Sequence, residues 1–431
     1  MHTNQVYREL VTVNNGSHKW WHRRWVKIIG ISGIVVIVSA IILALVLNFV
    51  VFAPKKSETN TTAATSSSPL TITISITTSL VTPTTTLPQI ITTTTSVVTP
   101  TTTQRPTWSA TGIMNNARYS HTASVLSNGK VLVAGGAGID NSVLNSAELY
   151  DATTGTWTTT SNMTNAREAH TASILSNGKV LVAGGAGIHN SVLNSAELYD
   201  PSTGTWAITS NMNNARSVHT ASVLLNGKVL VAGGWDVNTS SLNSAELYDP
   251  SIGTWTTTGR MNNARYYHTA SVLSNGKVLV TGGYNSELYD PSTDTWTATG
   301  SMTNARIGHR ASVLPNGKVL VTGGLGITGS FNIAELYDPS TGAWTTTGNM
   351  NNTRRFHTAS VLSNGRVLVT GGSSSGTLES AELYDPLTGT WTTTSNMNNV
   401  RSWHTASVLS NGRVLVTGGR SYNALDSTEL Y

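Results

Sequence analysis

Seven histidines recur at nearly constant spacing along the C-terminal part of the chain, separated by 49, 49, 49, 41, 48 and 47 residues. They are His121, His170, His219, His268, His309, His357 and His404. An arginine stands three residues before each histidine, and a Glu-Leu-Tyr triplet follows in each unit. Imidazole and carboxylate could bind metal or relay protons, but a metal needs three or four ligands about 2 Å away. Equivalent residues of repeated units form a wide ring, so we expect histidines that hydrogen-bond between strands and arginines that donate to loop carbonyls.

The repeated unit predicts an all-β fold. Each copy contains four short strand-like runs, which read HTASVL, KVLV, SAELYD and TWTTT in typical copies. Asn-Gly separates the first two runs, and this dipeptide between apolar segments is a strong hairpin signal. Four strands in a period of 40 to 50 residues are typical of a β-propeller blade.

The two ends of the repeated region complement each other. The last unit ends at Tyr431 after its third run, and residues 107–114 (TWSATGIM) supply an isolated fourth run before the first full unit. Pairing these ends would complete a seventh blade and remove the free sheet edges that invite aggregation. We therefore expect residues 107–431 to form one closed seven-bladed propeller.

The repeated motif resembles the kelch repeat. Arg-x-x-His, Gly-Gly, Tyr-Asp-Pro, Trp and Met recur over residues 113–431, with Val-Leu-Val before Gly-Gly where an aromatic residue is usual. The resemblance implies a kelch-type seven-bladed propeller. Intracellular kelch proteins that serve as ubiquitin-ligase adaptors carry a further folded domain, which we do not expect within residues 1–106.

Catalytic relatives of this architecture need residues that the chain does not supply. Galactose-oxidase-like enzymes hold copper with a cysteine-crosslinked tyrosine, and the chain has no cysteine. The DPSTGTW turn departs in spacing from the sialidase aspartate box that it faintly resembles. The carboxylates outside the repeat pattern are scattered over different units: Asp140, Glu168, Asp236, Glu379 and Asp426. We expect no catalytic residues, cofactor or metal, with a galactose-oxidase-like or sialidase-like carbohydrate-active enzyme as the alternative.

Sequence variation concentrates on one predicted face of the propeller. If the strands of a blade are antiparallel, the loops between its second and third strands share a face with the connections between blades, including the two residues before each histidine. Binding residues tend to lie on loops carried by a rigid scaffold, and aromatic and arginine side chains are frequent anchors. The candidate ligand-binding residues are Tyr266, Tyr267, Arg355, Phe356 and Trp403, with Trp235, Tyr284, Arg420 and Tyr422 on the loops. The alternative is that these rings fill gaps between blades.

The N-terminus predicts a membrane anchor. Residues 28–53 contain no charge over 26 residues, which exceeds the ~20 residues that cross a bilayer. Residues 1–27 contain five Lys or Arg and three tryptophans near the span, and only Lys55 and Lys56 follow it closely. This asymmetry predicts a cytoplasmic tail, a signal-anchor helix and an extracellular propeller. A cleaved signal peptide is the competing interpretation, but its apolar region would be about 7–15 residues long.

Residues 54–106 are rich in Thr, Ser and Pro. This composition predicts an extended, O-glycosylated stalk, or otherwise an unmodified disordered linker. Candidate N-glycosylation sites are Asn60, Asn162, Asn238 and Asn351. Residues 107–431 contain 18 Lys and Arg against 19 Asp and Glu, which argues against nucleic-acid binding. We expect a membrane-anchored module that recognises a protein or glycan, in the plasma membrane or an internal one.

Overall fold

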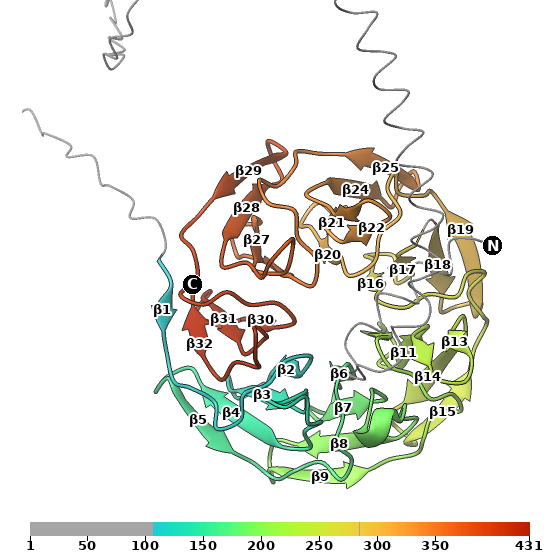
Figure 1. The fold of residues 1–431 in the computed structure, drawn as a ribbon. Coiled ribbons are helices and arrows are strands. Elements are labelled where there is room, and N and C mark those ends of the chain that lie inside the picture. Colours follow the sequence, from blue (N-terminus) through green and yellow to red (C-terminus); the bar gives the residue numbers. More distant parts are fainter. Residues whose placement is uncertain (1–106, 284) are drawn as a thin grey trace, which may run out of the picture. The chain divides into compact units, whose positions relative to one another are not determined.

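The computed structural model describes residues 107–283 and 285–431. They form seven four-stranded antiparallel sheets that stand as blades around one axis (Figure 1). The predicted all-β, seven-bladed propeller is therefore confirmed. Within the described residues no helix is long and apolar enough to span a membrane, and the predicted span 28–53 and the stalk 54–106 lie outside those residues.

Each blade runs from an innermost first strand to an outermost fourth strand, so the strands fall into four groups. The first strands are β2 (Thr122–Val125), β6 (Thr171–Ile174), β10 (Thr220–Val223), β16 (Thr269–Val272), β20 (Arg310–Val313), β26 (Thr358–Val361) and β30 (Thr405–Val408). The second strands are β3 (Val131–Ala134), β7 (Val180–Ala183), β11 (Val229–Ala232), β17 (Val278–Thr281), β21 (Val319–Thr322), β27 (Val367–Thr370) and β31 (Val414–Thr417).

The outer half of each blade follows the same order. The third strands are β4 (Ala147–Asp151), β8 (Ala196–Asp200), β14 (Ala245–Asp249), β18 (Ser286–Asp290), β24 (Ala334–Asp338), β28 (Ala381–Asp385) and β32 (Thr428–Leu430). The fourth strands are β5 (Thr156–Thr159), β9 (Thr205–Ile208), β15 (Thr254–Thr257), β19 (Thr295–Thr299), β25 (Ala343–Thr346), β29 (Thr390–Thr393) and β1 (Ser109–Ala110). Small loop elements are the hairpins β12 (Trp235–Asp236) with β13 (Ser240–Ser241) and β22 (Leu325–Gly326) with β23 (Gly329–Ser330), and a 3₁₀ turn at Ile188–Asn190.

The last blade is built from both ends of the described chain. Ser109 and Ala110 of β1 pair with Leu430 and Glu429 of β32. Trp108 donates its indole N–H to the Ser395 carbonyl of the preceding blade at 2.8 Å. This pairing within one blade closes the ring of described residues without a covalent link.

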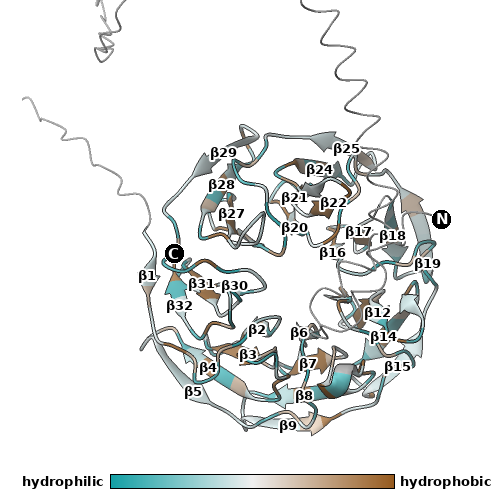
Figure 2. Cartoon of the chain, in the orientation of Figure 1, coloured by the Kyte–Doolittle hydropathy of each residue, from teal (hydrophilic) through white to brown (hydrophobic). Residues whose placement is uncertain are grey.

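The core lies between neighbouring blades rather than within one sheet. All seven second strands are fully buried, and Figure 2 colours β7 and β31 as hydrophobic. A representative cluster joins Leu181 and Met212 to Val229 and Tyr248 of the next blade. The Val-Leu-Val run packs on both faces, which explains why it lacks the polar alternation of a half-exposed strand.

Each blade also contains one buried ion pair, which fastens the connection between blades. Arg167 donates to the carbonyls of Gly184 at 2.8 Å and Ser195 at 3.0 Å, and its guanidinium lies 2.8 Å from the Glu197 carboxylate. Glu197 in turn accepts the backbone N–H groups of Thr164 and Asn165. The same arginine and glutamate occur in all seven blades. The prediction that the arginines donate to loop carbonyls is confirmed, and the glutamates are the structural partners of these arginines.

Candidate functional site

Seven residues, one before each repeated histidine, surround the propeller axis. We call them the axial ring: Ser120, Ala169, Val218, Tyr267, Gly308, Phe356 and Trp403. All seven have positive φ, between 48° and 62°. Each backbone N–H donates to the carbonyl of the preceding member, and Ser120 closes the circle by donating to Trp403 at 3.0 Å. A non-glycine residue pays about 1–2 kcal/mol for this conformation, so the closed hydrogen-bond circle holds six strained residues in place. Such clustered strain is a recognised mark of functional positions.

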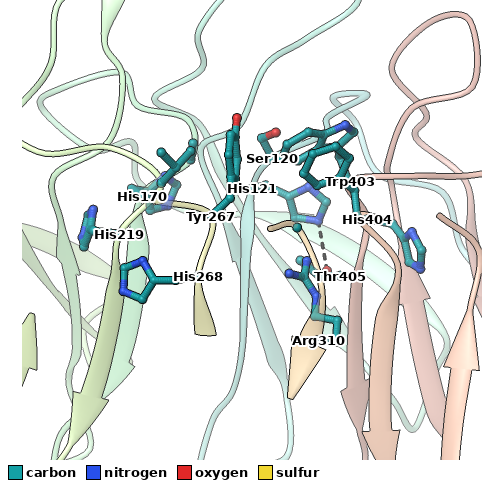
Figure 3. Close-up of a pocket in the computed structure, with 14 residues that line it drawn as sticks. Ser120, His121, His170, His219, Tyr267, His268, Arg310, Trp403, His404 and Thr405 are labelled. Atoms are coloured by element: carbon teal, nitrogen blue, oxygen red, sulfur yellow. Dashed lines mark hydrogen bonds between the residues drawn. The ribbon is translucent and has the colours of Figure 1, made fainter. Parts of the chain in front are cut away.

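The side chains of the axial ring line a pocket of about 230 Å³. Its other lining residues include Arg310, Thr405 and several of the repeated histidines (Figure 3). The ring is asymmetric, because Ser120, Ala169, Val218 and Gly308 are small while the remaining three members are aromatic. The same backbone in every blade therefore surrounds a pocket that has small residues on one side and aromatic residues on the other.

Tyr267, Phe356 and Trp403 form one aromatic cluster. Phe356 and Trp403 are stacked with ring centroids 3.7 Å apart, and the Tyr267 ring lies edge-on to both at 5.4 Å. Gly308 makes this possible, since a Cβ at that position would lie 2.6 Å from the Phe356 ring. All three rings are half-buried, and all three line the pocket.

Arg310 brings a positive charge to the pocket. It lies below Tyr267 and Trp403 in Figure 3. The equivalent residue of the other six first strands is threonine. Its guanidinium is half-buried and makes a long hydrogen bond of 3.4 Å to the His309 carbonyl.

A second charged group lies near the aromatic cluster. Glu168 is half-buried, and burial raises the pKa of its carboxyl group while the Arg420 guanidinium opposes that shift. Burial and the Glu168 carboxylate raise the pKa of Tyr267 above its usual range, so this phenol stays protonated. Arg420 itself lies over the Tyr119 ring, 5.2 Å from its centroid.

The repeated histidines are structural links between blades. His170 Nε2 lies 3.0 Å from the Thr122 hydroxyl of the preceding blade, and His121 makes the same contact with Thr405 (Figure 3). The predicted hydrogen bonding between strands is confirmed. Burial, assisted by the neighbouring Arg167, lowers the pKa of His170 to about 3, and the Nδ1 atom of each repeated histidine is buried without a hydrogen-bond partner among the described residues. The imidazoles are therefore neutral.

The structure brings some of the predicted binding residues together and separates others. Tyr266 joins the aromatic cluster through Tyr267, with ring centroids 5.6 Å apart. Arg355 is half-buried and donates to the Ser330 hydroxyl at 3.2 Å. Trp235 lies on the β12–β13 hairpin, Tyr422 is 93% exposed, and neither lines the pocket. Tyr284 lies outside the described residues.

The candidate glycosylation sites differ in their surroundings. Asn162 and Asn238 are exposed. Asn351 is also exposed, but its side-chain amide donates to the buried carboxylate of Glu382 at 3.0 Å, as Asn115 does to Glu148 in another blade. Asn60 lies outside the described residues.

The two charged residues Arg310 and Glu168 were not among the predicted binding residues. Arg310 replaces the threonine of the HTASVL run, and this break in the repeat was a signal available in the sequence. Glu168 varies at the position two residues before a histidine, but without the fold nothing placed it beside Tyr267. Both lie near the axis, where residues from distant repeats converge.

Comparisons with known proteins agree with this architecture. The family model described as the KLHDC2/KLHL20/DRC7 Kelch-repeats domain matches residues 88–283 and residues 219–419. A solved structure entitled "Novel fungal alcohol oxidase with catalytic diversity among the AA5 family, in complex with copper" is similar with a TM-score of 0.63. It is 20% identical over 76% of this chain and 76% of that chain, a likeness that shows the fold alone. Comparison with curated proteins gives no match.

Proposed function

Because the chain belongs to the kelch-repeat family, we propose that it is a recognition module that binds a protein or glycan at the axial pocket without catalysing a reaction. The observation that carries this proposal is the axial ring. Its backbone is the same in every blade, whereas its side chains differ and gather three half-buried aromatic rings on one side. Aromatic anchors at a pocket are typical of recognition surfaces.

Copper chemistry like that of the similar alcohol oxidase does not fit the donors of this chain. Among the described residues, no three His, Cys, Asp or Glu side chains gather as possible ligands of one ion. The repeated histidines use Nε2 for contacts with threonine hydroxyls. The chain also has no cysteine to crosslink a tyrosine. We therefore favour recognition over a carbohydrate-active enzyme.

The proposal includes a single-pass membrane anchor with the propeller outside the cell. It is supported by the 26 uncharged residues 28–53, the basic residues before them and the Thr/Ser-rich segment 54–106. A C-terminal tag, protease treatment of intact cells and N-glycosidase digestion test this arrangement. A protease-accessible band that shifts on deglycosylation is expected, whereas a protected and unshifted band contradicts an outward propeller.

Recognition is tested with the purified full-length chain on arrays of glycans and secreted-protein ectodomains. We expect Trp403→Ala to weaken the strongest array signals at least tenfold, because it removes the stacked partner of Phe356. Tyr422→Ala is the matched control, since this exposed aromatic residue lies outside the pocket. Equal losses in the two variants, or no binding by the unaltered chain, contradict recognition at the axial pocket.

A further inference from the structure

Arg310 differs in kind from the seven buried arginines of the propeller. Seven arginines each pair with a glutamate of their blade. Among the described residues, Arg310 has no carboxylate within ion-pair distance. A charge that is partly withdrawn from water is costly unless it is paired, and the threonine of the other six blades would avoid this cost. Arg310 therefore fits a position whose partner comes from a ligand.

The groups around Arg310 leave its charge uncompensated. His268 and His404 line the same pocket, and burial lowers the pKa of both imidazoles well below the usual value, so they carry no charge. The carboxylate of Glu168 acts on Tyr267 and Tyr119 but makes no ion pair with Arg310. The pocket thus combines a cationic group with an aromatic cluster and the hydroxyl-bearing Ser120 and Thr405.

We propose that the axial pocket binds an acidic sugar at the end of a glycan, with the sugar carboxylate on Arg310 and a face of the ring against the aromatic cluster. This inference rests on the proposed recognition function and names its ligand class. A guanidinium offers two parallel N–H donors that match a carboxylate. The apolar C–H face of a pyranose buries against flat aromatic rings, while its hydroxyl groups need polar partners such as Ser120.

The size of the pocket and its position on the axis favour a sugar residue over a protein segment. At about 230 Å³ it is smaller than the roughly 300–1,000 Å³ of sites for drug-sized ligands, so one ring-sized group fills it. The hydrogen-bonded circle of the axial ring surrounds the axis, so a ligand enters along the axis by a free end. An Asp or Glu side chain could reach Arg310, but it is too small to cover the three aromatic rings.

The test compares methyl glucuronide with methyl glucoside, which share a ring and differ in the carboxylate. Binding to the full-length chain is followed by ligand-detected NMR, with N-acetylglutamate amide as the protein-like acid. The variant Arg310→Thr restores the residue of the other six blades and gives His357 the threonine neighbour that its counterparts have. It is therefore expected to fold normally, which its unfolding midpoint verifies.

We expect the glucuronide to bind roughly 10- to 100-fold more tightly than the glucoside, and Arg310→Thr to abolish that difference. Equal binding of the two sugars, or unchanged glucuronide binding in Arg310→Thr, overturns the proposal. Binding of the glutamate amide through Arg310 without binding of the glucuronide also overturns it and assigns the pocket to a protein acid. If Trp403→Ala abolishes array binding but Arg310→Thr does not, recognition at the pocket is supported and the acidic-sugar proposal is contradicted.

Discussion

The four residues from each repeated arginine to its histidine include two kinds of position: the arginine and histidine are the same in every blade, whereas the residue before the histidine differs. Arg401 and His404 are buried and have equivalents in all seven blades, whereas Trp403 has a different residue at its equivalent in every other blade. The first pair holds blades together through Glu429 and Thr370. Trp403 lies in the axial ring and lines the pocket. Over four residues, the repeated side chains build the scaffold, and the side chains that break the repeat define the site.

The largest expected effect comes from acid, which destabilises the scaffold by acting on the repeated histidines. Burial, with the neighbouring Arg306, lowers the pKa of His309 to about 3, and the other repeated histidines shift in the same direction. The unfolded chain therefore takes up protons first, so stability is lost as pH falls below about 6.5 towards the folded-state pKa. Each imidazole that stays neutral in the folded protein lowers the free energy of unfolding by about 1.4 kcal/mol per pH unit below this value. The seven together lower it by on the order of 10 kcal/mol per pH unit.

Since domains are stable by about 5–15 kcal/mol, we expect unfolding by about pH 5. Circular dichroism across pH 7 to 4 measures this transition. His309→Gln removes one titrating group, so the dependence of unfolding free energy on pH should become about one-seventh less steep. A propeller that remains folded at pH 4 would contradict neutral, buried histidines.

Removal of one buried charge is the next largest effect. Arg167→Ala leaves the Glu197 carboxylate buried without its cation, and we expect a loss of about 3–5 kcal/mol in the free energy of unfolding. Lys179→Ala in the same blade is the control, because the Lys179–Asp200 pair is exposed to solvent and should contribute little. Urea titrations of both variants measure the difference, and similar losses would contradict the structural role of the buried pair.

The strain of the axial ring gives a smaller effect of opposite sign. Ala169 has a φ of 50°, and Ala169→Gly should stabilise the protein by up to about 1 kcal/mol, because glycine adopts this conformation freely. Ala172→Gly on the adjacent strand β6 should instead destabilise by about 0.5–1 kcal/mol. Thermal unfolding of the two variants shows whether the ring is strained, and a loss of stability in Ala169→Gly would argue against it.

Glycosylation provides the smallest effect. If the propeller enters the secretory pathway, we expect N-glycans on the exposed Asn162 and Asn238 but not on Asn351, whose amide binds Glu382. Mass spectrometry of N-glycosidase-treated peptides assigns the occupied sites. Full occupancy of Asn351 would contradict this prediction, because the glycan is attached to the same amide nitrogen that donates to Glu382.

The fold was predictable because the same strand and turn pattern recurs seven times in the sequence. The period, the Asn-Gly turns and the incomplete last unit specify blades, register and closure without long-range information. The site was predictable only in part. Tyr267, Phe356 and Trp403 were among the candidates, but their stacking across the axis depends on the circular closure and on the left-handed backbone, which residue patterns do not encode. Arg310 was missed because it lies inside a strand that is otherwise repeated.

The central claim is tested most directly by comparing Trp403→Ala with Trp391→Ala. Ligand binding and the unfolding midpoint are measured on the same preparation of each variant. Trp391 belongs to the scaffold, since it donates to the Gly348 carbonyl at 2.8 Å and packs against Tyr384. We predict that Trp403→Ala loses array binding with little change in midpoint, whereas Trp391→Ala lowers the midpoint and, while folded, still binds. Binding that survives in Trp403→Ala, or is lost from folded Trp391→Ala, would contradict the assignment of recognition to the side chains that break the repeat.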